Sequence, residues 1–215
     1  MGTKPLTKIL TIPIIVVLLF IFYTIFIMDK SDNNENEVLD PQPGTSSSSQ
    51  ETPQSNSTAF FVNSSAFEDG ERIPSKYCTE GVEGGENISI PVSWAGIPEG
   101  TESLFLVIVD PHPVAQNWIH WVVKDIPIST TKLDEGASNT SMPGGVTELS
   151  GTEGTQSYRG PEPPPDTGDH PYEIHLFALS ADKVEITNNP TWEQIESTLE
   201  PLIVEQTKYT GYFGR

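Results

Sequence analysis

Cysteine and positive charge are both scarce in this sequence. Cys78 is the single cysteine among 215 residues, so no intrachain disulfide can form and no disulfide framework can support the fold. Only 11 Lys and Arg stand against 30 Asp and Glu, which gives a formal net charge of −19. Nucleic-acid binding depends on clustered positive charge that neutralises phosphates. The composition therefore argues against a nucleic-acid partner.

The sequence also lacks the common catalytic motifs. It contains no Gly-x-Ser-x-Gly elbow, no phosphate-binding glycine loop and no dinucleotide fingerprint, and its four histidines form no His-Glu-x-x-His pair. We therefore predict a protein that is not an enzyme and that needs neither a cofactor nor a metal. A metal-dependent hydrolase using Asp110, His112 and His120 stays open as an alternative, because Asp-x-His with a distant histidine can supply ligands.

One long apolar run is present, and it lies near the N-terminus. Residues 9–28 are 20 consecutive residues without a charge, and as a helix they would cross the roughly 30 Å core of a bilayer. Lys4 and Lys8 precede the run, so the positive-inside rule predicts a cytoplasmic N-terminus, residues 1–8, and a domain outside the membrane. A cleaved signal peptide and a secreted product are the alternative, although the run ends in bulky residues that do not suit a cleavage site.

The segment that follows the apolar run differs in composition from the rest of the chain. Residues 29–59 are rich in Ser, Asn and Glu and almost free of apolar residues, so they cannot bury enough surface to offset the entropy of ordering. We predict a disordered tether. The remaining residues, 60–215, carry 24 acidic and 8 basic residues and are long enough for one domain with a sizeable core.

The hydrophobic pattern of residues 60–215 is mainly that of β-strands. Strands are predicted at 87–94, with Pro91 favouring a sheet edge, and at 104–109, 118–126 and 172–179. The run LFLVIV at 104–109 has the continuous apolar character of a central strand that is buried on both faces. A helix is predicted at 191–204, capped by Thr191 and bent by Pro201, before a short strand or tail at 208–215.

Two segments carry candidate binding residues. In QNWIHWVVKDIP (116–127), strict alternation would place Trp118, His120 and Val122 on one face, with a histidine that must find a partner. Asp110 ends the preceding predicted strand, and we expect its carboxylate to orient the imidazole of His120. In SYRGPEPPPDTGDHPY (157–172), prolines form a stiff rim, and His170 and Tyr172 supply donors that suit an anion.

These segments, together with AFEDGERIPSKYCTEG (66–81), ISIPVSWAGIPEGTESLFLVIVDPHP (88–113) and the closing TGYFGR, resemble the phosphatidylethanolamine-binding protein family. The resemblance is to its prokaryotic Raf kinase inhibitor-like (YbhB/YbcL-type) branch and covers residues 66–215. It implies a mainly β fold, a β-sandwich with a large central sheet, a smaller sheet and a C-terminal helix. Here that domain would be preceded by one transmembrane helix.

The resemblance also implies a ligand-binding site for phosphate-type anions or phospholipid head groups. The positions that match the family's motifs are Asp110, Pro111, His112, Trp118, His120, Pro163, Pro164, His170 and Tyr172. His112 stands where the family usually has an aspartate. Glu162 replaces a small residue of the rim and Pro171 replaces an arginine, so the rim is less positive than is usual in the family.

The predicted function is thus a membrane-tethered binding module with a pocket for a small anion. Because family members inhibit kinases or proteases, the resemblance implies a protein partner of that kind. A protein-interaction domain whose pocket is vestigial remains open beside the hydrolase alternative.

Overall fold

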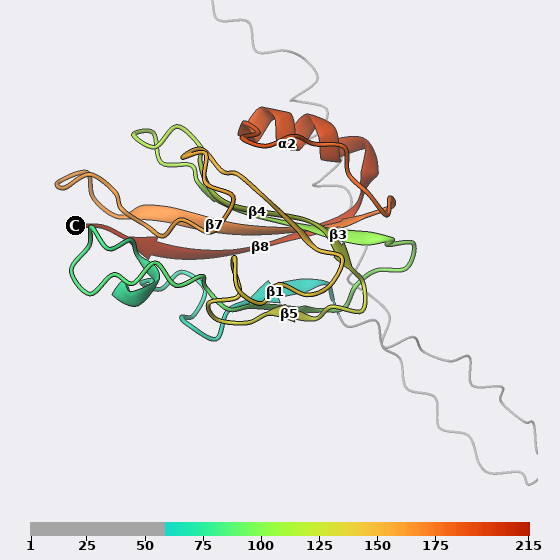
Figure 1. Ribbon diagram of the computed structural model, residues 1–215, viewed down its shortest axis with the longest axis horizontal. Coiled ribbons are helices and arrows are strands. Elements are labelled where there is room, and N and C mark those ends of the chain that lie inside the picture. Colours follow the sequence, from blue (N-terminus) through green and yellow to red (C-terminus); the bar gives the residue numbers. More distant parts are fainter. Residues whose placement is uncertain (1–58) are drawn as a thin grey trace, which may run out of the picture. The chain divides into compact units, whose positions relative to one another are not determined.

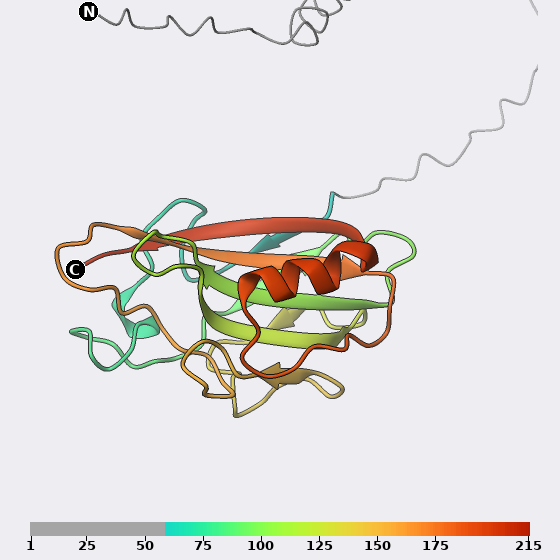
Figure 2. The same ribbon diagram turned by 90° about the horizontal axis from the view of Figure 1, so that it is seen from above.

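The computed structural model describes residues 59–215, which fold into two β-sheets and one helix (Figures 1 and 2). One sheet has three strands in the order β1-β2-β5, and the other has five strands in the order β6-β4-β3-β7-β8. The elements in chain order are β1 (Phe61–Asn63), η1 (Ser75–Tyr77), β2 (Val92–Ala95), β3 (Ser103–Asp110), β4 (Trp118–Pro127), β5 (Lys132–Leu133), β6 (Thr147–Leu149), β7 (His170–Leu179), α2 (Trp192–Leu199), η2 (Glu200–Leu202) and β8 (Ile203–Phe213).

The five-stranded sheet is the middle layer of the domain. Figure 1 shows α2 over one of its faces and the three-stranded sheet under the other. All eight residues of β3 are buried. Leu104 and Ile108 belong to the core between the sheets, whereas Phe105 and Val107 belong to the core beneath α2 with Ile195. The prediction of a central strand buried on both faces is therefore confirmed.

The first predicted strand differs from the structure. Residues 87–94 were expected to form an edge strand, but β2 begins only at Val92 and is the middle strand of the small sheet. Pro91 has no N–H with which to join a sheet ladder, so regular pairing starts after it. Its carbonyl instead accepts a hydrogen bond from the Ser64 hydroxyl at 2.7 Å.

The predicted helix at 191–204 is shorter in the structure. Thr191 caps α2, as the sequence suggested, and the structure adds a capping box with Gln194, but the helix ends at Leu199. Pro201 lies in the 3-10 turn η2, because proline cannot donate the helical hydrogen bond of its position. The chain then enters β8, an 11-residue strand antiparallel to β7, where a short strand or tail had been expected.

Three further predictions concern the N-terminal part of the chain. The cytoplasmic segment 1–8, the membrane span 9–28 and all but the last residue of the tether 29–59 lie outside the described residues. Within residues 59–215, no helix has the length and apolar character that crossing a bilayer requires.

Candidate ligand-binding pocket

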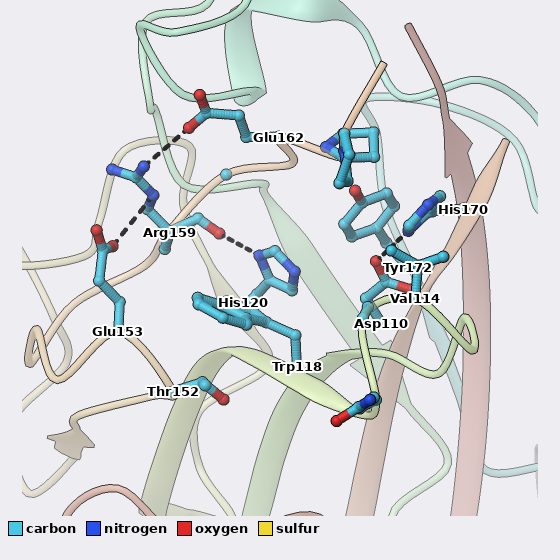
Figure 3. A pocket seen from close by; sticks show the side chains of 15 residues that line it. Asp110, Val114, Trp118, His120, Thr152, Glu153, Arg159, Glu162, His170 and Tyr172 are labelled. Atoms are coloured by element: carbon cyan, nitrogen blue, oxygen red, sulfur yellow. Dashed lines mark hydrogen bonds and ion pairs between the residues drawn. The ribbon is translucent and has the colours of Figure 1, made fainter. Parts of the chain in front are cut away.

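A pocket of about 640 Å³ opens at one end of the five-stranded sheet. Because β4, β3 and β7 are antiparallel neighbours, the last residue of β3 and the first residues of β4 and β7 meet at the same end. The loop before β7 closes the other side. The lining residues are Asp110, Val114, Ala115, Gln116, Trp118, His120, Thr152, Glu153, Arg159, Gly160, Glu162, Pro163, Pro164, His170 and Tyr172 (Figure 3).

His120 reaches the pocket through a β-bulge. Along β3, Ile108 pairs with Trp121 and Val109 pairs with Ile119, so His120 is an extra residue without a partner of its own. The strict alternation expected for this strand is therefore wrong at His120. Ile119 and Val122 both pack in the core beneath α2, while Trp121 packs between the sheets. Bulges of this kind commonly re-aim a side chain next to a functional site.

The imidazole of His120 is oriented by the backbone. Its Nδ1 lies 2.8 Å from the carbonyl oxygen of Arg159, and its ring packs edge-on against Tyr172 with the centroids 5.0 Å apart. His120 is only 6% exposed, and burial lowers its pKa to about 4. At neutral pH the ring is therefore uncharged. The expectation that Asp110 orients this imidazole is wrong, since a main-chain carbonyl occupies that position.

Asp110 instead pairs with His170. Its Oδ2 lies 2.6 Å from Nδ1 of His170, and both side chains are almost fully buried. The other ring nitrogen, Nε2, lies 2.9 Å from the hydroxyl of Thr167. Both nitrogens of His170 are thus occupied within the protein. His170 lines the pocket, but it is not the free donor that the sequence predicted.

Pro111 and His112 lie beside the pocket and are not among its lining residues. The ring of His112 stacks on that of His170 with 3.7 Å between centroids. Its backbone N–H donates to Oδ1 of Asp110 at 2.9 Å, a local turn that holds the carboxylate in place. His112 therefore supports the Asp110–His170 pair from outside the cavity.

Tyr172 supplies the clearest donor in the pocket. Burial, followed by the charge of Asp110, raises the pKa of its hydroxyl, which therefore keeps its proton. Its hydroxyl makes no hydrogen bond within residues 59–215. Every buried side-chain nitrogen or oxygen in this part of the chain has a hydrogen-bond partner, so the hydroxyl oxygen of Tyr172 cannot be buried. Because Tyr172 lines the pocket, the hydroxyl reaches its open space.

Arg159 is a pocket residue that the sequence analysis missed. Its Nε lies 3.1 Å from Glu153 and its Nη2 lies 2.9 Å from Glu162 (Figure 3). The Glu162 carboxylate also accepts a hydrogen bond from the Thr79 hydroxyl at 2.7 Å. The only arginine that lines the pocket is therefore bound by two acidic side chains. The arginine in the segment YRGPE was the available signal; Glu162 closes that same segment, and Glu153 lies six residues upstream.

Apolar side chains also line the pocket. Pro163 and Pro164, which the sequence predicted as a rim, line it together with Trp118 and Val114, whose exposed fractions are 37% and 52%. Proline has no N–H, so this rim shapes the opening without adding donors. Among the residues that the structure describes, no three His, Cys, Asp or Glu side chains are grouped so as to hold a metal ion.

Comparisons with known proteins agree with this architecture. The family model described as "Phosphatidylethanolamine-binding protein" matches residues 63–214. A UPF0098 protein of Methanothermobacter thermautotrophicus is 35% identical over 151 residues, which are 70% of this chain and 95% of that protein. The UPF0098 protein YbcL of Escherichia coli is 32% identical over 137 residues, or 61% of this chain and 74% of YbcL.

Solved structures are similar as well. The crystal structure of E. coli YbcL, described as a member of the mammalian PEBP family, gives a TM-score of 0.67 at 27% identity and covers 73% of this chain and 98% of its own. The Chlamydia trachomatis homologue CT736 gives a TM-score of 0.61 with the same identity and the same coverage.

Proposed function

The chain belongs to the phosphatidylethanolamine-binding protein family, and on that premise we propose that its folded domain binds a small anion of the phosphate or phospholipid head-group type. The observation that carries the proposal is the convergence in one pocket of two polar atoms, Nε2 of His120 and the hydroxyl of Tyr172, that have no hydrogen-bond partner within residues 59–215. A cavity of about 640 Å³ lies within the usual range for small-ligand sites.

The charges of the pocket argue for modest affinity. Asp110, Glu153 and Glu162 line it, and Arg159 is the only Lys or Arg among the lining residues. Because Arg159 is already paired with Glu153 and Glu162, a ligand anion would find no free cation there. We expect dissociation constants of roughly millimolar order for inorganic phosphate.

The wider role that we propose is a membrane-tethered binding module. The apolar run at 9–28 and the polar segment 29–59 would hold the domain outside the membrane, within reach of a kinase or protease partner. The family resemblance and these sequence features support this role.

Binding is tested by titrating the full-length chain, in detergent, with inorganic phosphate. We expect ¹³C resonances of selectively labelled His120 and Tyr172 to shift in a saturable way, because a ligand would contact both side chains. His175 is an internal control, since it packs against Trp192 and pairs with Glu173 on the face that α2 covers. Unmoved His120 and Tyr172 signals at about 10 mM phosphate would reject the proposal.

A further inference from the structure

The hydrogen bond of His120 to the backbone determines which of its nitrogens carries a proton. A carbonyl oxygen can only accept, so the contact of 2.8 Å with the Arg159 carbonyl requires a hydrogen on Nδ1. A neutral imidazole has one N–H. Its Nε2 is then a bare lone pair, and it has no partner within residues 59–215 although it opens into the pocket.

The surroundings of His120 keep the ring neutral. Burial is the largest cause of its lowered pKa, and the positive charge of Arg159 acts in the same direction. The Arg159 carbonyl, the carboxylate of Asp110 and the backbone of Gly160 raise the pKa by smaller amounts, and Asp110 is already paired with His170. Tyr172 lies on β7 and packs against the His120 ring. Its hydroxyl keeps its proton because burial raises its pKa.

The pocket floor therefore offers a ligand one bare acceptor, Nε2 of His120, and one donor, the hydroxyl of Tyr172. The carboxylate of Asp110 is already hydrogen-bonded to His170 and to the backbone of His112. Arg159 is tied to Glu153 and Glu162. A fully ionised phosphate would place an acceptor oxygen against the lone pair of His120, which is repulsive. A phosphate that keeps one P–O–H can donate to His120 and accept from Tyr172.

We propose that the pocket binds its anion together with one proton, as the monoanion of a phosphomonoester or of inorganic phosphate, with Nε2 of His120 accepting a hydrogen bond from the ligand's P–O–H. The inference rests on the proposed function and specifies the ligand of that same site. A simple phosphodiester has no P–O–H and lacks the donor that His120 requires. A ligand that is a dianion in solution takes up one proton from the buffer when it binds.

The test is isothermal titration calorimetry of the full-length chain in detergent with methyl phosphate, a monoester, and dimethyl phosphate, a diester. Titrations at pH 8 in two buffers of different ionisation enthalpy give the number of protons taken up. We expect about one proton per methyl phosphate, and an association constant that falls about tenfold per pH unit from pH 7 to 9, above the second pKa of about 6 for a phosphomonoester. Dimethyl phosphate should bind at least about tenfold more weakly at pH 6, independently of pH.

Two further measurements locate the proton. The ¹⁵N signal of Nε2 in His120 should shift by a small amount on binding methyl phosphate and stay typical of an unprotonated nitrogen, while that of Nδ1 stays typical of N–H. An Nε2 signal that moves into the N–H range would place the proton on His120 and overturn the assignment. The matched variant Tyr172→Phe loses the donor and keeps the acceptor, so it should weaken binding without changing proton uptake. Uptake with an unmoved Nε2 signal would place the proton elsewhere and overturn the assignment.

The remaining outcomes separate this inference from the proposed function. Methyl phosphate that binds without proton uptake, or dimethyl phosphate that binds equally well, would overturn the inference and leave an anion pocket in place. Glycerophosphoethanolamine that binds more tightly than methyl phosphate at pH 8, without proton uptake, would make an ammonium group the donor and overturn the monoester assignment. If none of these ligands nor phosphate binds at about 10 mM, the proposed function itself fails.

Discussion

At the scale of single residues, the hydrogen bonds within the protein determine which polar atoms of the pocket a ligand can contact. Asp110 is hydrogen-bonded to His170 and to the backbone of His112, and His170 is hydrogen-bonded to Asp110 and Thr167. These atoms already have partners and form part of the pocket wall. The atoms left over, Nε2 of His120 and the Tyr172 hydroxyl, are those that a ligand can contact. The chemistry of the site therefore depends on fewer side chains than line it.

Glu162 is expected to lower the affinity of the pocket for phosphate. Its carboxylate holds Arg159 at 2.9 Å and lines the pocket, so it both occupies the arginine and repels an anion. We expect Glu162→Gln to strengthen phosphate binding by about 0.5–1 kcal/mol, roughly two- to fivefold, because one negative charge near the ligand is lost. The amide oxygen of glutamine can still accept the hydrogen bond of Thr79. Calorimetric titration with phosphate measures the change.

The control for that prediction is Glu205→Gln. Glu205 lies exposed on β8 and does not line the pocket, so this variant removes the same charge at a distance. Its affinity should equal that of the wild type. Equal gains in both variants would show that the overall net charge, and not the charge of Glu162 at the pocket, controls binding.

At the scale of elements, the loop before β7 determines the shape of the pocket. Gly160 packs so tightly that a Cβ there would lie 2.2 Å from the carbonyl oxygen of Tyr77. Its N–H donates to the side chain of Asn87 at 2.8 Å, and the hydroxyl of Tyr158 donates to the same Tyr77 carbonyl at 2.9 Å. These contacts hold the loop, and with it Arg159, against the segment that follows η1.

We therefore expect Gly160→Ala to lower the free energy of unfolding by about 2–3 kcal/mol and to weaken phosphate binding, because the loop must move away from the backbone it touches. Chemical denaturation and phosphate titration measure the two effects. Gly144→Ala is the matched control, since a Cβ at Gly144 would meet nothing within 4 Å. A Gly160→Ala protein with wild-type stability and affinity would show that the loop is free to shift.

At the scale of the whole molecule, residues 9–28 are predicted to attach the domain to a membrane. The sequence predicts an uncleaved anchor at 9–28, with cleavage and secretion as the alternative. We expect the full-length chain to stay with membranes after an alkaline carbonate wash, and limited proteolysis within 29–59 to release a soluble, phosphate-binding domain. Leu19→Arg, which adds about 3–4 kcal/mol to the cost of membrane insertion, should reduce membrane retention. A soluble wild-type product that begins after residue 28 would establish cleavage.

The sequence alone was sufficient for the family, for three strands of the large sheet and for the start of the helix. Continuous apolar runs and ordered motifs are local signals, and they led to β3, β4, β7, the capped start of α2 and the resemblance that the comparisons confirm. The proline rim and the positions of His120 and Tyr172 in one pocket also followed from the resemblance.

Hydrogen-bond partners were decided only by the tertiary structure. The bulge at His120 depends on the register with β3, and the pairing of Asp110 with His170 depends on how β3 and β7 meet. Arg159 is paired with Glu153 and Glu162, which lie near it in the sequence but contact its guanidinium only through the conformation of the folded loop. Periodicity predicts the face on which a side chain lies, but a hydrogen bond needs atoms within about 3 Å, and those distances exist only once the strands and loops have packed.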